Sequence, residues 1–320
     1  MNAFFKKIAL PIMVVGLVAC GGSDDDDSAA AVGDIVDVAI EIGNFTQLTD
    51  LLTTAGLVDT LKDPDAKFTV FAPTDEAFAK LDPALVATLT QAGNEELLKQ
   101  VLTYHVVAGE VDSVAAFEAV GSKVGTLSGD VAVSSVEGDL FINLSKVVTP
   151  DVDATNGIIH AIDTVLIPVG LGEEAPTLNI VDTAVAAGNF TTLEAALGAT
   201  NLVSTLSNPE GSFTVFAPTD DAFAKLGQET IDALIADPAT LTKILLKHVV
   251  AGSVDSVTAL TFNGLNVPTL NTDGETLALD IFSGDDVFVN DSQITTFDIQ
   301  TTNGIIHVID SVILLDLPDE

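Results

Sequence analysis

The sequence has a single cysteine, no tryptophan, one tyrosine and no arginine among its 320 residues. With Cys20 as the only thiol, no internal disulfide can form, so the fold must be held by packing alone. Without arginine, the chain lacks the usual bidentate clamp for phosphates and carboxylates. Acidic residues number 47 against 11 lysines, and the formal net charge is −36. Such a surface repels phosphate backbones, which excludes nucleic acid as a partner.

The acidity has two interpretations. It keeps a protein soluble in salty water, and it can also recruit cations or a cationic partner. The hydrophobic content of 48% is ample for packed cores, and the length suits about two domains of ordinary size.

The first nineteen residues have the pattern of a signal peptide. Lys6 and Lys7 precede a short apolar run, 8–18, which is too short to span a bilayer as a mature helix. Ala19 suits signal-peptidase cleavage, and Cys20 follows at once. This arrangement resembles the bacterial lipobox, which implies that the thiol of Cys20 is acylated and becomes the mature N-terminus. The alternative is a conventional secretory signal with an incidental cysteine.

Residues 20–34 are predicted to form an acidic, flexible tether. Gly21, Gly22 and Ser23 are followed by four adjacent aspartates, 24–27, which repel one another and stay solvated. Acidic stretches at this place resemble sorting signals that send some lipoproteins to the cell surface, and a plain spacer is the alternative. The N-terminus therefore predicts a protein of the cell envelope that is lipid-anchored to the outer membrane, with surface exposure as one outcome.

The remainder of the chain is one unit written twice. A segment that begins IVDVAIEIGNFTQL at Ile35 returns as IVDTAVAAGNFTTL at Ile180, 145 residues later. A period this long indicates two whole domains, because solenoid repeats run at roughly 20 to 50 residues. Glycine, glutamate and proline cluster between the copies. The predicted organisation is a signal peptide at 1–19, a tether at 20–34, a first domain at 35–168, a linker at 169–177 and a second domain at 178–320.

Each unit changes its hydrophobic period halfway. Residues 35–42 place apolar side chains at i, i+3, i+4 and i+7, which predicts a helix, and 94–102 has a similar pattern. A short apolar segment at 68–72 predicts a strand, and more strands are expected at 131–136, 140–144, 146–148 and 158–167. Helices that come first and strands that come last favour an α+β domain.

Two long blocks carry a family resemblance. FTVFAPTDEAF at 68–78 returns as FTVFAPTDDAF at 213–223, and TNGIIHAID at 155–163 returns as TNGIIHVID at 302–310. The sequence resembles the fasciclin family over 35–320. The resemblance implies a β-sandwich wedge flanked by several helices, a role in adhesion or extracellular binding, and no common catalytic activity.

Tyr104 and His105 resemble a tyrosine–histidine pair of the same family, and they are the candidate binding residues. The second copy has Lys247 and His248 at these positions. One hypothesis places Tyr104 or His105 partly exposed at a recognition edge, where an apolar ring with a polar tip suits binding. The alternative is that both residues pack between helix and sheet.

No constellation for catalysis or metal binding is recognisable. The four histidines are two positions seen twice, and His160 and His307 lie in apolar strands, where a neutral imidazole is expected to donate a hydrogen bond. With no usable thiol, a zinc site would need carboxylates at no recognisable spacing. We therefore expect no enzyme, no metal and no cofactor.

Two functions remain for the sequence. The first is adhesion, in which two linked modules on a lipid anchor bind an unknown protein or polysaccharide on a cell surface or in a matrix. The second is an envelope binding protein for a small apolar ligand or a polymer. An apolar pocket would favour the second, and an exposed patch around Tyr104 the first.

Overall fold

The computed structural model describes residues 33–281 and 286–315. The signal peptide, Cys20 and nearly all of the tether lie outside the described residues. Within the described ranges, no helix is long and apolar enough to cross a membrane.

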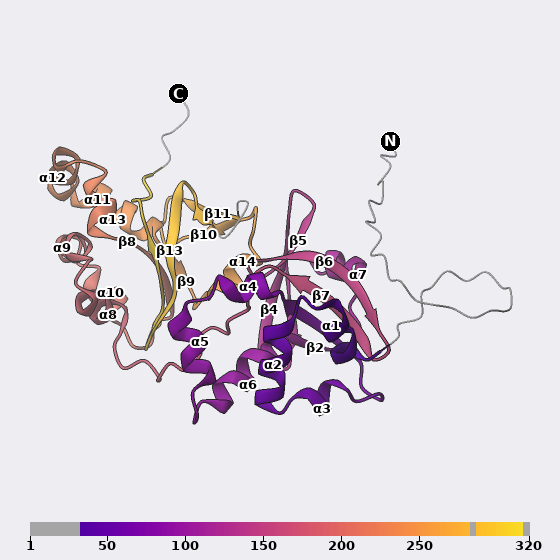
Figure 1. Ribbon diagram of the computed structural model, residues 1–320. Helices are drawn as coiled ribbons and strands as arrows, with labels where there is room; N and C mark the ends of the chain where they lie inside the picture. Colours follow the sequence, from indigo (N-terminus) through magenta and orange to yellow (C-terminus); the bar gives the residue numbers. More distant parts are fainter. Residues whose placement is uncertain (1–32, 282–285, 316–320) are drawn as a thin grey trace, which may run out of the picture. The chain divides into compact units, whose positions relative to one another are not determined.

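The two halves of the chain repeat one order of helices and strands (Figure 1). The N-terminal half contains α1 (Ile35–Ile42), α2 (Thr46–Ala55), α3 (Val58–Leu61), β1 (Phe68–Pro73), α4 (Asp75–Ala79), α5 (Pro83–Thr90), α6 (Glu95–Tyr104), β2 (Val106–Ala108), α7 (Ser113–Glu118), β3 (Ser122–Thr126), β4 (Gly129–Val136), β5 (Asp139–Ile142), β6 (Ser145–Ala154) and β7 (Gly157–Ile162). The C-terminal half contains α8 (Ile180–Ala187), α9 (Thr191–Ala199), α10 (Val203–Leu206), β8 (Phe213–Pro218), α11 (Asp220–Ala224), α12 (Gln228–Ala236), α13 (Pro238–Lys247), β9 (Val249–Ala251), α14 (Ser256–Leu260), β10 (Asn266–Pro268), β11 (Thr276–Ile281), β12 (Val287–Val289), β13 (Ser292–Thr301) and β14 (Gly304–Ile309).

Each half builds a seven-stranded sheet. The order in the N-terminal half is β2-β1-β7-β6-β5-β4-β3, and that in the C-terminal half is β10-β11-β12-β13-β14-β8-β9. Among the described strands, the parallel pairs are those between the strands of the two repeated blocks, β1 with β7 and β8 with β14. β6 and β13 carry register shifts, where a long strand bends. The expected α+β class, with a bent sheet flanked by helices, is confirmed.

Two apolar clusters lie on the two sides of the first sheet. One joins α1, α2 and α6 to the outward side chains of β1 and β7, such as Val70 and Ile159. The other fills the space inside the bend with alternate residues, such as Phe71 and Ile162. Because successive side chains of a strand point to opposite faces, the continuous apolar runs of β1 and β7 serve both clusters.

The polar residues of the repeated blocks hold the helices against the sheet. Asp75 accepts hydrogen bonds from Thr46 Oγ1 at 2.7 Å and from Gln47 N at 2.9 Å, at the start of α2. Asn156 accepts from Ile35 N at 2.9 Å, and its amide donates to Leu61 O at 2.7 Å. Asp220 and Asn303 repeat these bonds in the second half. The polar residues of the blocks that carry the family resemblance therefore stabilise the fold by hydrogen bonds to neighbouring helices.

The glycine after each of these asparagines is required by close backbone approach. Gly157 has φ +154°, and a Cβ at this position would lie 1.9 Å from the carbonyl oxygen of Phe68. Gly304 has φ +151° and the same distance to the carbonyl oxygen of Phe213. A side chain here would separate the central parallel strands.

Candidate functional site

Tyr104 ends helix α6 with its ring turned into the bend of the sheet. The side chain is 2% exposed and packs with the inner cluster that contains Phe71. Its hydroxyl donates to Asp130 O at 2.7 Å and accepts from Asn143 Nδ2 at 3.2 Å. Burial raises the pKa of this phenol above its ordinary value. Tyr104 is therefore a packing residue whose polar tip is satisfied internally.

His105 is buried beside it and is held by backbone groups on both ring nitrogens. Nδ1 lies 2.8 Å from Val101 O, and Leu166 N donates to Nε2 at 2.9 Å. A carbonyl can only accept and a backbone N–H can only donate, so Nδ1 carries the proton and the ring is neutral. Burial lowers the pKa of His105 to about 4. The hypothesis that Tyr104 or His105 is partly exposed is wrong, because the helix ends over the sheet and both side chains fill the gap.

The rings of the other three histidines are also hydrogen-bonded to backbone groups. His248 has Nδ1 at 2.8 Å from Ile244 O and accepts from Ile313 N at 3.0 Å. His160 Nε2 lies 2.8 Å from Val111 O, and His307 Nε2 lies 2.9 Å from Val254 O. The expected hydrogen bond from each strand histidine to a carbonyl is confirmed. Among residues 33–281 and 286–315, no three His, Cys, Asp or Glu side chains gather in a group that could hold a metal ion.

A buried ion pair replaces the tyrosine in the second half. Lys247 is fully buried, with Nζ 2.7 Å from Glu275 Oε2. Thr126 Oγ1 donates to Gly129 O at 2.7 Å and Thr269 Oγ1 donates to Glu275 O at 2.8 Å, so Glu275 takes the position of Gly129. Gly129 has φ +135°, and a Cβ there would lie 3.3 Å from Cε2 of Tyr104. Tyrosine with glycine in one half and lysine with glutamate in the other therefore fill the same space. The lysine was noted from the sequence but its partner was missed, because Glu275 lies just before β11, after a turn that is longer in the second half than in the first.

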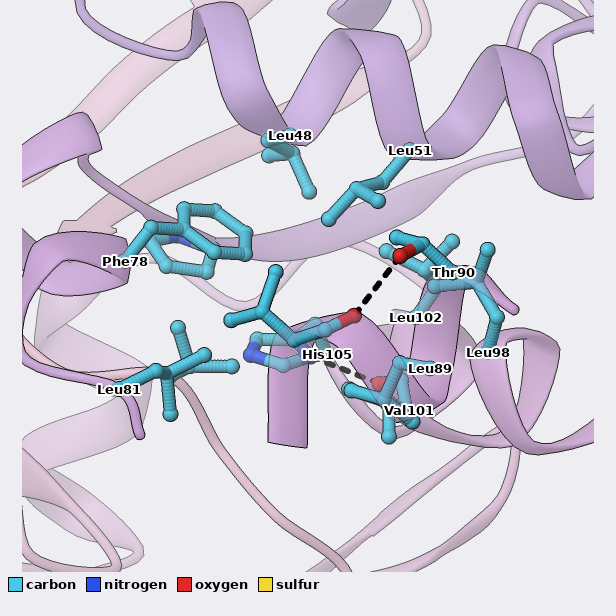
Figure 2. Close-up of a pocket in the computed structure, with 13 residues that line it drawn as sticks. Leu48, Leu51, Phe78, Leu81, Leu89, Thr90, Leu98, Val101, Leu102 and His105 are labelled. Carbon is cyan, nitrogen blue, oxygen red and sulfur yellow. Dashed lines mark hydrogen bonds between the residues drawn. The ribbon is translucent and has the colours of Figure 1, made fainter. Parts of the chain in front are cut away.

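An apolar cavity lies among the helices of the first half. Its lining includes Leu48, Leu51 and Phe78, whose side chains lie on one side of His105 in Figure 2. The cavity volume is about 20 Å³. A cavity of the same volume in the second half reaches His248 but lies farther toward α8 and the sheet. A volume of about 10–15 Å³ holds one water molecule, whereas ligand pockets measure hundreds of Å³. In this conformation the cavity has no room for an apolar ligand of ordinary size.

Comparison with known proteins identifies the same two repeated halves as members of one domain family. A family model for the fasciclin domain matches residues 43–168 and again 188–315. The chain therefore belongs to the fasciclin domain family, with two domains in tandem.

Relatives are found in animals and bacteria. Transforming growth factor-beta-induced protein ig-h3 of Sus scrofa is 31% identical over 251 residues, which cover 78% of this chain and 35% of that protein. An uncharacterized protein of Synechocystis is 42% identical over 135 residues, which cover 42% of this chain and 97% of that protein. A solved FAS1 domain pair from the insect cell adhesion molecule fasciclin I aligns over 86% of this chain and 98% of that chain, with 18% identity and a TM-score of 0.39. The chain thus spans about a third of the length of ig-h3.

Proposed function

We propose that the chain is a non-enzymatic adhesion or extracellular binding module of the cell envelope. The observation that carries the proposal is the tandem pair of fasciclin domains. Their recurring polar residues are engaged in the fold: the histidines bind backbone groups, and Asp75 and Asn156 hold helices. A chain that uses these residues to build rigid domains is suited to presenting surfaces.

The anchor in this proposal is the acylated thiol of Cys20. Its support is the positive and apolar stretch before Cys20 and the acidic tether after it. Each buried methylene of an acyl chain contributes about 0.8 kcal/mol, so several chains anchor a protein durably. The proposed location is the outer membrane, with the domains carried by the tether.

The proposed partner is a protein or polysaccharide on a cell surface or in a matrix. Two linked modules can gain about 10² to 10⁴ in avidity over one, so each contact can be weak. The net charge of −36 favours a partner with basic groups and disfavours anionic ones. A small apolar ligand is not proposed, because the apolar cavities measure about 20 Å³.

Anchoring is tested by Cys20→Ser. The wild-type chain is expected in the membrane fraction with the added mass of acyl chains, and the variant is expected in the soluble fraction. Retention of the variant in the membrane at the wild-type mass would remove the anchor from the proposal.

Binding is tested separately, with purified chain immobilised on beads and incubated with envelope and matrix fractions. A retained protein or polysaccharide that is competed by free chain supports the module. The same material retained on chain unfolded by heat would indicate charge alone.

A further inference from the structure

A polar cleft lies beside the start of α14 and is lined by residues of both halves of the chain. Its volume is about 170 Å³, whereas each of the two apolar cavities measures about 20 Å³. Ordinary ligand pockets begin at roughly 300 Å³. The cleft therefore has room for one small unit of a larger molecule, such as a single sugar of a polysaccharide or a single side chain of a protein.

Part of the lining is apolar. Pro168 and Val257 are buried, Val169 is half-buried, and the ring of Tyr104 contributes as well. Gly129 lies next to this ring, because a Cβ there would be 3.3 Å from Cε2 of Tyr104. The glycine thus keeps the approach to the ring open. These groups provide a surface on which the C–H groups of a ligand can pack.

Three polar side chains of the lining are not used by the fold. The amide of Gln100, the hydroxyl of Ser128 and the carboxylate of Asp130 make no hydrogen bond or ion pair within the part of the chain that the structure describes. The hydrogen bonds of these residues come from backbone atoms, such as the carbonyl of Asp130 that accepts from Tyr104. The three side chains therefore retain their full capacity for a ligand.

The other polar side chains of the lining are Lys123 of β3 and Asp255, which precedes α14. Lys123 Nζ donates to Thr258 Oγ1 at 2.6 Å and lies 3.8 Å from Asp255 Oδ1. The same carboxylate oxygen accepts from Thr258 N at 2.6 Å and caps the helix. An ammonium has three donors and a carboxylate has two oxygens, so the pair keeps one donor and one acceptor oxygen in reserve.

The chemistry of the lining distinguishes among the possible units. A sugar has hydroxyls that both donate and accept, so it can satisfy Gln100, Ser128 and Asp130 while its C–H groups pack on the apolar part. A lysine or arginine side chain has donors only, so it leaves the N–H groups of Gln100 without an acceptor, and Lys123 repels it. An anionic unit is disfavoured by Asp130 and by the net charge of −36.

We infer that this cleft binds a neutral sugar unit of a polysaccharide. The inference rests on the proposed function, because it specifies which of the proposed partners the chain takes and where it takes it. One sugar in an open cleft of this size is expected to bind weakly, with a dissociation constant in the millimolar range. Many anchored chains that hold one polysaccharide gain avidity, so weak individual contacts are sufficient.

The test is ligand-detected NMR of the purified full chain with the methyl glycosides of glucose, galactose, mannose and N-acetylglucosamine. A lysine with blocked termini is the probe for a basic side chain. All chains carry Cys20→Ser, so that acyl chains do not contribute. Gln100→Ala combined with Asp130→Ala removes two of the free groups. Asp50→Ala is the matched control, because Asp50 is an exposed carboxylate of α2, and melting curves establish that the variants are folded.

At least one of the four sugars is expected to bind the chain with the intact cleft and the Asp50 variant equally, at low and at high salt. The double variant should bind that sugar at least tenfold more weakly. Since Tyr104 is the only tyrosine and the chain has no tryptophan, the bound sugar should also change the fluorescence of the chain. The inference is overturned if none of the four sugars binds, if the double variant binds as tightly as the intact cleft, or if only the lysine derivative binds.

The bead experiment described above separates this inference from the proposed function. A polysaccharide retained by the intact chain and lost from beads that carry the double variant supports the cleft. A partner retained equally by both would overturn the cleft and leave the proposed function standing. Absence of any retained partner from all fractions would remove the proposed function itself.

Discussion

The buried pair of Lys247 and Glu275 allows the packing of the second domain to be tested quantitatively. Removing one partner of a buried ion pair costs about 3–5 kcal/mol, because the remaining charge loses its compensation. The side chain of Glu275 is partly exposed, so Glu275→Ala is expected at the lower end, about 3 kcal/mol. For a domain of this size each kcal/mol lowers the melting temperature by about 3–4 °C, which gives a fall of about 10 °C.

The compensating change distinguishes this mechanism from a general loss of packing. Lys247→Met combined with Glu275→Ala removes both charges and keeps an apolar stem, and replacing a buried ion pair by apolar groups is often nearly neutral. The double variant should therefore recover most of the loss, with a coupling of at least about 1.5 kcal/mol. Calorimetry of the full chain measures both domains, and the transition of the first domain serves as an internal reference. Additive single effects, with no recovery in the double variant, would refute the ion-pair explanation.

Three further predictions concern the buried histidines, the domain boundary and Tyr104. Burial lowers the pKa of His105 and His248 to about 4 from 6.5, so their contribution to stability is complete above about pH 6.5 and is lost as the pH falls toward 4. One pKa unit is about 1.4 kcal/mol, so each domain should lose about 3 kcal/mol over that window in urea titrations, and a flat profile would contradict the neutral, buried state. The segments 32–170 and 175–320, expressed separately, should each melt cooperatively and gain stability with salt, whereas two molten products would contradict the predicted linker. Tyr104→Ala should lower the first domain's melting temperature by several degrees, with binding tracking the folded fraction, and loss of binding at an unchanged melting temperature would show a recognition residue.

Much of the fold could be predicted because its signals are local. The helix at 35–42 was predicted with the bounds that the structure has, since its apolar face and terminal glycine are contiguous in sequence. The strand predicted at 158–167 ends at Ile162 instead, because the N–H of Leu166 donates to the ring of His105 and not to a neighbouring strand. Helix α7 was not predicted, since its exposed Val114 and Phe117 give no pattern of a buried face.

The candidate site was harder to predict because its geometry depends on distant parts of the chain. A signal for burial of Tyr104 and His105 was present, since they continue the spacing of Leu98 and Val101 along the inner face of α6. The second half has Lys247 in place of Tyr104 and Glu275 in place of Gly129. The sequence alone could not show that these two replacements are in contact, because their proximity depends on how the strands pair. The spacing of apolar residues therefore predicts which face of a helix is buried, but it does not predict which residue of the sheet that face contacts.

The most direct test of the central claim is the attachment of cells that carry this chain to matrix-coated surfaces and to other cells. Cells with the wild-type chain should attach severalfold more than cells without it. Cells with Cys20→Ser should fall to the level of cells without the chain, while the folded variant is recovered from the medium or the periplasm. Equal attachment by all three strains, with the wild-type chain folded and present in the envelope, would contradict the account.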